Sequence, residues 1–191
     1  MTAGEKRPFM GRQLEIFPDT FVCFDIETTG LSPARDDIIE ISALKIENGV
    51  TTDSFSKLIR INRPLPPFIR SLTGITDEML KNGEAAEDVL ADFCDFSAGY
   101  TVMGHNVRFD LNFVYDNCLA RLGTVFDNDY VDTLAISRRV LKNLKHHRLD
   151  DIVDCFGIEG RTLHRALGDV ELTVKCYNKL RETAENAVVR Y

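Results

Sequence analysis

The sequence predicts one α/β domain built around a mixed β-sheet. Strand-like apolar runs fill its first third, and helical spacing then alternates with short strand-like runs, an order that is typical of this class. The chain has 191 residues, of which 44% are hydrophobic and 28% charged, so it is long enough to bury one sizeable core.

The first three predicted strands form a meander. Residues 20–26 are an apolar run of strand length, and residues 38–46 are largely apolar with partial alternation. Asn48-Gly49 is a strong signal for a two-residue hairpin turn, and a third strand is expected at 54–61. The three strands are therefore expected to be neighbours in the sheet.

The rest of the chain alternates predicted helices and strands after a proline-rich segment. Residues 62–76 contain Pro64, Pro66 and Pro67 and are expected to form a loop with at most a short helical turn. Short strands are expected at 100–104 and 129–133. Apolar residues at helical spacing predict helices over 84–96, from Asn106 as N-cap to Leu122, and over 134–142, 148–155 and 163–185.

Composition limits the classes of function. A net charge of −7 argues against a protein that coats nucleic acid non-specifically, although an enzyme that grips one strand end is still compatible with it. The five cysteines stand far apart without metal-ligand spacing, which disfavours a zinc site or a disulfide framework. Residues 1–18 are expected to be a flexible arm before a domain at 19–185. The absence of a signal peptide or membrane-spanning run predicts a cytoplasmic protein.

Two acids follow the first apolar run, in the stretch FVCFDIETTGL at 21–31. Alternate strand residues share a face, so Asp25 and Glu27 point the same way and Phe24 and Ile26 point the other. Buried acids need a partner, and carboxylate oxygens suit Mg²⁺ or Mn²⁺. If the strand instead ends at Phe24, both acids are solvated and no cation is required.

Two further acids lie on predicted helices. Asp110 is four residues after Asn106, in the first turn, where the helix dipole alone would also favour an acid. Asp169 lies beside the apolar stripe of the last helix and needs a partner there. The stripe comprises Ala166, Val170, Thr173, Tyr177 and Leu180.

His164 precedes Asp169 by five residues, which on a regular helix turns the two side chains about 140° apart. They can converge only if His164 lies at or before the helix start, with Thr162 as N-cap. Taken alone, His164 is better interpreted as an exposed first-turn residue. His105, His146 and His147 are interpreted as structural or surface residues.

Three segments, FDIETTG, GHNVRFD and HRALGD, resemble in order and spacing the three motifs of the DEDD-type 3′–5′ exonucleases, in the histidine branch that includes bacterial proofreading exonucleases. TGIT at 73–76, VDTL at 131–134 and HHRLDDI at 146–152 strengthen this resemblance, which covers residues 20–182. It implies a ribonuclease-H-like fold, with a five-stranded mixed sheet flanked by helices.

The resemblance also implies the chemistry. Two Mg²⁺ or Mn²⁺ ions would bind at Asp25, Glu27, Asp110 and Asp169, with His164 as the general base that activates water. The last phosphodiester would be hydrolysed to release a nucleoside 5′-monophosphate. The residues that would contact the terminal nucleotide are Thr28, Thr29, Gly30, Leu31, Ile75, Asn106 and Phe109.

The expected partner is the 3′ end of a single-stranded nucleic acid, DNA in preference to RNA. The basic stretch 138–148 could follow the strand or be only a solvated helix face. QLEIF at 13–17 resembles sliding-clamp pentapeptides, but a lead-in to the first strand is the preferred interpretation, and a DNA polymerase is a further possible partner. Two alternatives stay open: an oligoribonuclease or RNA-trimming enzyme, and a non-catalytic nucleic-acid or polymerase-tethering module.

Overall fold

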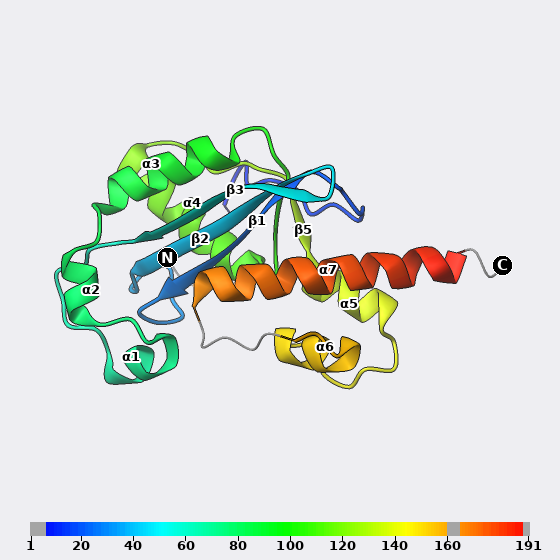
Figure 1. Cartoon of the computed structure of the whole chain (residues 1–191). Coiled ribbons are helices and arrows are strands. Elements are labelled where there is room, and N and C mark those ends of the chain that lie inside the picture. Colours follow the sequence, from blue (N-terminus) through cyan, green and yellow to red (C-terminus); the bar gives the residue numbers. More distant parts are fainter. Residues whose placement is uncertain (1–6, 160–164, 189–191) are drawn as a thin grey trace.

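The computed structural model describes residues 7–159 and 165–188 and contains the predicted five-stranded mixed sheet (Figure 1). The strand order is β3-β2-β1-β4-β5. The first three strands are antiparallel neighbours, whereas β4 runs parallel to both β1 and β5. The strands are β1 (Phe21–Thr28), β2 (Ile38–Glu47), β3 (Val50–Leu58), β4 (Val102–Gly104) and β5 (Tyr130–Asp132).

The predicted hairpin joins β2 to β3. Asn48 and Gly49 have φ angles of 52° and 77°, the positive values that a tight two-residue turn requires. Because this turn is so short, β3 begins at Val50, earlier than the predicted start at residue 54. The first residues of β3 are exposed and, apart from Val50, polar, which suits an edge strand and explains why hydrophobic patterning missed them.

Two short helices lie where the sequence predicted no stable element. The first, α1, begins at the second of two consecutive prolines, and the second, α2, is capped by the Thr76 side chain, which accepts a hydrogen bond from the Met79 backbone N–H. The other helices match their predicted places. The helices of the described residues are α1 (Pro67–Thr73), α2 (Asp77–Lys81), α3 (Ala86–Ser97), α4 (Arg108–Leu122), α5 (Thr133–Val140), α6 (Leu149–Phe156) and α7 (Ala166–Val188).

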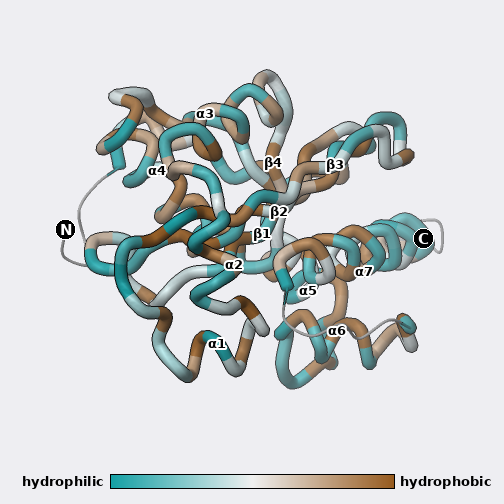
Figure 2. The backbone as a smooth tube through the Cα atoms, turned by 60° about the vertical axis from the view of Figure 1, so that its left-hand side comes forward, coloured by the Kyte–Doolittle hydropathy of each residue, from teal (hydrophilic) through white to brown (hydrophobic). Residues whose placement is uncertain are grey.

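Helices cover both faces of the sheet. Phe24 and Ile26 pack on one face against apolar residues of α3 and α4, and Phe21 and Cys23 pack on the other against α5 and α7. In Figure 2 the central strands are predominantly hydrophobic, as burial on both faces requires. The predicted stripe on α7 is confirmed, since all five of its residues are buried. None of the helices in the described residues is both long and apolar enough to cross a membrane.

Residues 7–18, the described part of the predicted arm, pack on the domain. The segment pairs with the edge strand β5: the Leu14 N–H donates to the Tyr130 carbonyl at 2.7 Å, and the Tyr130 N–H donates to the Arg12 carbonyl at 2.9 Å. Leu14 and Phe17 pack against the α7 side of the core. An unpaired strand edge explains this docking, which polar composition does not reveal.

Candidate active site

The end of β1 and the first turns of α4 and α7 meet at one pocket of about 220 Å³. This pocket brings together the four predicted metal ligands from three distant segments. His164, the predicted general base, lies outside the described residues. The pocket is lined by Asp25, Ile26, Glu27, Leu72, His105, Asn106, Phe109, Asp110 and Asp169.

Three of the acids are close enough to share one cation. Each of Asp25, Glu27 and Asp169 offers a carboxylate oxygen, and these oxygens lie within 4.8 Å of one another. Within the described part of the chain, the side-chain carboxylates of Asp25 and Glu27 accept no hydrogen bond and form no ion pair. Such a set of hard oxygen donors fits Mg²⁺ or Mn²⁺.

Asp110 is held against the strand that carries the other acids. Its Oδ1 accepts a hydrogen bond from the Ile26 N–H at 3.3 Å, across 84 residues of sequence. The side chain is 4% exposed, so the first turn of α4 presents this acid inward and not to solvent. The favourable effect of the helix dipole on a first-turn acid therefore does not by itself explain why an acid is buried at position 110.

Burial and mutual repulsion disfavour the ionised carboxylates. Burial, and then the charges of Asp110 and Glu27, raise the pKa of Asp25 well above its usual value. Burial, followed by Asp169 and Glu40, raises the pKa of Glu27 to about 8. Burial likewise raises the pKa of Asp110 to about 8. A bound cation would offset all three penalties, since it favours the charged form of each acid.

Sequence reasoning missed an ion pair beside these acids. Glu40 on β2 is 2% exposed and lies opposite Glu27 in the β1–β2 register. Its carboxylate accepts two hydrogen bonds from Arg165, from Nη2 at 2.8 Å and Nε at 3.2 Å, and one from the Ala166 N–H at 3.4 Å. The pair fixes the start of α7 to β2. A charged residue inside the apolar run IIEISAL was the available signal.

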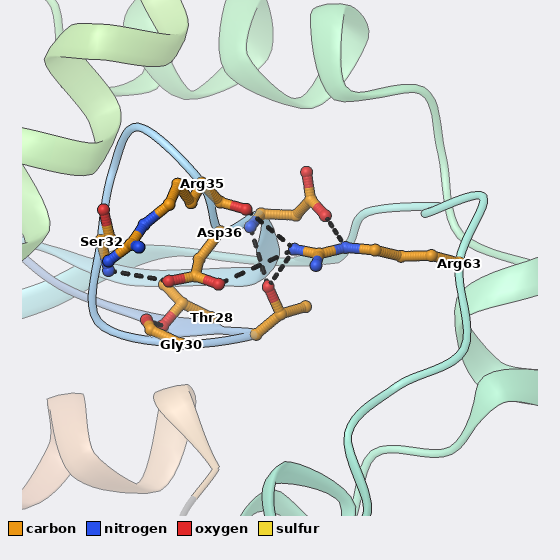
Figure 3. Close-up of polar contacts among 8 residues, drawn as sticks. Thr28, Gly30, Ser32, Arg35, Asp36 and Arg63 are labelled. Atoms are coloured by element: carbon orange, nitrogen blue, oxygen red, sulfur yellow. Dashed lines mark hydrogen bonds and ion pairs between the residues drawn. The ribbon is translucent and has the colours of Figure 1, made fainter. Parts of the chain in front are cut away.

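The loop after β1 is held by polar contacts within it and with Arg63, which follows β3 (Figure 3). The Thr28 hydroxyl donates to the Gly30 carbonyl at 2.6 Å, and Arg63 Nη2 donates to the Thr29 hydroxyl at 2.7 Å. The Ser32 N–H donates to Asp36 Oδ2 at 2.8 Å. The Thr28 and Thr29 side chains are therefore buried in loop structure, and their predicted contact with a nucleotide remains a prediction.

The predicted apolar contacts divide into exposed and buried residues. Leu31 is 85% exposed and Phe109 lines the acid pocket. Ile75 is 0% exposed and packs in a small core with Ile39, Leu65 and Leu80, so its contact with a nucleotide remains a prediction. Burial there lets Ile75 support the α1–α2 segment. Leu72 of α1, 37% exposed, lines the pocket.

Asn106 and His105 occupy the wall of the pocket formed after β4. Asn106 was predicted as the N-cap of the following helix, but that cap is Val107. With φ at 60°, Asn106 instead turns the chain in the left-handed region, which asparagine tolerates, while its N–H donates to Asp132 Oδ1 at 2.9 Å. His105 is structural as expected: its ring nitrogens lie 3.0 Å from Thr133 Oγ1 and 2.9 Å from the His147 carbonyl.

Comparisons with known proteins agree with this geometry. Residues 22–177 match the exonuclease family RNase_T, and the chain belongs to this family. It is 36% identical over 170 residues to the PolC-type DNA polymerase III of Caldanaerobacter subterraneus subsp. tengcongensis, covering 89% of this chain and 12% of the polymerase. It is also 36% identical over 163 residues to the DNA polymerase III subunit epsilon of Aquifex aeolicus, covering 85% of this chain and 81% of that subunit.

The fold also resembles solved structures. The zinc-bound complex of E. coli exonuclease I with single-stranded DNA superposes with a TM-score of 0.78 at 23% identity, covering 91% of this chain and 42% of that one. This likeness and the sheet order confirm the predicted ribonuclease-H-like fold. The chain spans only 12% of the PolC-type polymerase that it matches.

Proposed function

We propose that the chain is a divalent-metal-dependent 3′–5′ exonuclease domain, spanning residues 19–185, that removes nucleoside 5′-monophosphates from single-stranded DNA. The observation that carries this proposal is the acid pocket, which combines Asp25, Glu27, Asp110 and Asp169 from three distant segments of an exonuclease-family chain. These acids do not serve folding alone, because their mutual repulsion destabilises the folded state.

Each group has a distinct part in the proposed reaction. Asp25, Glu27 and Asp169 would hold one cation, and Asp110, held against β1, would contribute to a second. Bound there, the cations would polarise the scissile phosphodiester and make water a stronger acid. His164 accepts the proton of the attacking water, a role that requires its neutral imidazole. The water oxygen bonds to phosphorus, the bond from phosphorus to the 3′ oxygen of the preceding nucleotide breaks, and that oxygen takes up a proton from solvent to leave as a 3′ hydroxyl.

The pocket walls suit a terminal nucleotide. Leu72 and Phe109 add apolar side chains to the lining of the acid pocket, against which a sugar and base would pack. Leu31 in the loop after β1 adds an exposed apolar side chain. Asn106 adds a polar side chain beside Asp110 that can contact the nucleotide.

The relatives support a role in DNA replication in the cytoplasm of a bacterium, as a proofreading or repair activity beside a polymerase. The two relatives are named as a DNA polymerase and a polymerase subunit, and the structural neighbour binds single-stranded DNA. Clamp binding through QLEIF is disfavoured, because Leu14 and Phe17 pack against the core and would first have to be released.

Digestion of matched 5′-labelled DNA and RNA single strands tests the proposal. With Mg²⁺ or Mn²⁺ we expect products that shorten by one nucleotide from the 3′ end, DNA being cut faster than RNA, and no products in EDTA. Faster cutting of RNA would make the chain an RNA-trimming enzyme. Binding without any cleavage would make it a tethering module.

Replacing His164 by Gln tests the proposed base. The single-turnover rate should fall by roughly 10²–10⁴-fold, the usual worth of general-base catalysis, while metal-induced stabilisation persists. The wild-type rate should fall on the acid side as the imidazole protonates, near pH ~6.5 for an unshifted histidine. An unchanged rate and acid limb in the variant would exclude His164 as the base.

A further inference from the structure

A second cavity, of about 840 Å³, adjoins the acid pocket. His105 and Asn106 line both cavities, so the two share one wall. We call the second cavity the basic groove. It runs between α5 and the chain that leads into α6, and its lining residues include no acid: they are His105, Asn106, Leu134, Arg138, Lys145, His146, His147, Arg148 and Leu149.

Two of the three arginine and lysine side chains that line the groove are not neutralised within the described residues. Arg138 and Lys145 are exposed and form no ion pair within the described residues. Arg148 differs, because its guanidinium bonds both oxygens of Asp151 at 3.0 Å and closes the first turn of α6. The groove therefore offers two free cations in a protein whose net charge is −7.

The basic residues of the stretch 138–148 lie on different surfaces of the protein. Arg139 lies on another surface, where its Nη1 is 3.6 Å from Glu15 and its guanidinium lies over the Phe17 ring. Lys142 is exposed and does not line the groove. Arg138 and Lys145 come from either side of a turn and line one concave surface. A solvated helix face does not explain this arrangement.

The floor of the groove is held in place. The two ring nitrogens of His105 join Thr133 of α5 to the His147 carbonyl, at 3.0 and 2.9 Å. His147 Nδ1 in turn lies 3.1 Å from the Ser137 hydroxyl. These bonds link α5 and the following loop, so Arg138 and Lys145 project from a built surface.

We propose that the basic groove binds the phosphodiester backbone of the nucleotides that precede the terminal one on a single strand of DNA. This proposal rests on the function proposed above. The acid pocket needs cations before it can accept a phosphate, whereas Arg138 and Lys145 attract phosphates directly. A strand whose last phosphodiester lies at the acids reaches the groove across the shared wall of His105 and Asn106.

Two matched double variants test the groove. Arg138→Gln with Lys145→Gln removes two charges from it, and Arg139→Gln with Lys142→Gln removes two charges from the same stretch outside it. Rates are measured on a ten-nucleotide DNA strand and on the p-nitrophenyl ester of thymidine 5′-monophosphate, which has no preceding phosphate. Strand binding is measured by fluorescence anisotropy in EDTA over a range of salt concentrations.

The groove variant should raise KM for the strand about tenfold with kcat and ester hydrolysis unchanged, and the control should match the wild type. Its log–log salt slope should fall in magnitude by about 1.4, because each phosphate contact on a single strand contributes about 0.7. Equal losses in both variants, or an unchanged salt slope, would overturn the proposal. If the wild type hydrolyses neither substrate, the proposed function fails, and the anisotropy comparison still decides whether the groove binds the strand.

Discussion

Glu40 and Asp132 are buried acids whose charge the chain itself satisfies, whereas Asp25 and Glu27, close by, have no such donors in the described residues. Glu40 bonds the Arg165 guanidinium and the Ala166 N–H. Asp132 accepts from the N–H groups of Asn106 and Leu134, both at 2.9 Å. Asp25 and Glu27 instead each have a carboxylate oxygen within 4.8 Å of a carboxylate oxygen of Asp169.

This difference separates structural acids from ligating ones. An acid with its own donors stabilises the elements that supply them, here the starts of α7 and α5. An acid that repels its neighbours destabilises the protein until a cation arrives. Removing an acid of each kind should therefore change the stability of the metal-free protein in opposite directions.

Asp25→Asn should have the largest effect. Activity should fall by about 10³-fold or more, since the loss of a metal ligand removes several kcal/mol of transition-state stabilisation. The melting temperature of the metal-free protein should rise, because a repelling charge is gone from the pocket. Single-turnover rates and thermal unfolding with and without Mg²⁺ measure both. A lower melting temperature in the metal-free variant would class Asp25 with Glu40 as a structural acid.

The metal-free protein should lose stability as the pH rises from about 5.5 to 8. Glu27 has a folded-state pKa of about 8 against 4.5 for the free side chain, so the folded state holds its proton more tightly. The stability that Glu27 contributes by holding this proton is fully present below the unfolded-state pKa and is lost as pH rises through the folded-state pKa. A fall of roughly 5–10 °C is expected from a loss of about 2–3 kcal/mol.

Thermal unfolding at fixed ionic strength measures this slope. Glu27→Gln should make it smaller, with the remainder due to Asp25 and Asp110, whose pKa values are also raised. Saturating Mg²⁺ should abolish it, because the cation keeps the carboxylates ionised. A slope of the same size in Glu27→Gln would place its origin elsewhere in the protein.

Glu40→Gln should lower activity by roughly 10–100-fold, the usual effect of losing a residue that orients metal ligands. The physical reason is that Glu40 and Arg165 position the start of α7, which carries Asp169. Stability should fall by about 1 kcal/mol, a discounted value because Arg165 is 41% exposed. Arg165→Gln should have a similar effect, and the double variant should lose less than the sum of the two. Additive losses would show that the pair does not act as a unit.

Asp132→Ala should have the smallest effect. Loss of the α5 cap costs about 1 kcal/mol, which lowers the melting temperature by about 2–4 °C in a protein of this size. The shift produced by Mg²⁺ should equal that of the wild type, because Asp132 is not among the clustered carboxylates. Titration of Mg²⁺ monitored by thermal unfolding measures it, and a weakened metal response would extend the ligating group to Asp132.

Local pattern predicted much of this protein without reference to distant contacts. Alternation in a strand places Asp25 and Glu27 on one face, and Asn48-Gly49 favours the left-handed conformations of a tight turn. The helical spacing of the α7 stripe predicted its buried face. Each of these properties depends on residues only a few positions apart, so the sequence by itself determines them. The motif resemblance added the expectation that the four acids would meet.

Tertiary structure alone decided the contacts that join distant segments. The Glu40–Arg165 pair spans 125 residues, and either side chain could equally have faced solvent until β2 and α7 packed. Docking of residues 12–14 required β5 to become a sheet edge, and burial of Ile75 required α1 and α2 to fold over β2. Arg138 and Arg139 are neighbours with the same charge, yet only one lines the basic groove. Which surfaces meet depends on the free energy of packing the whole chain, and that free energy is not a property of any short segment.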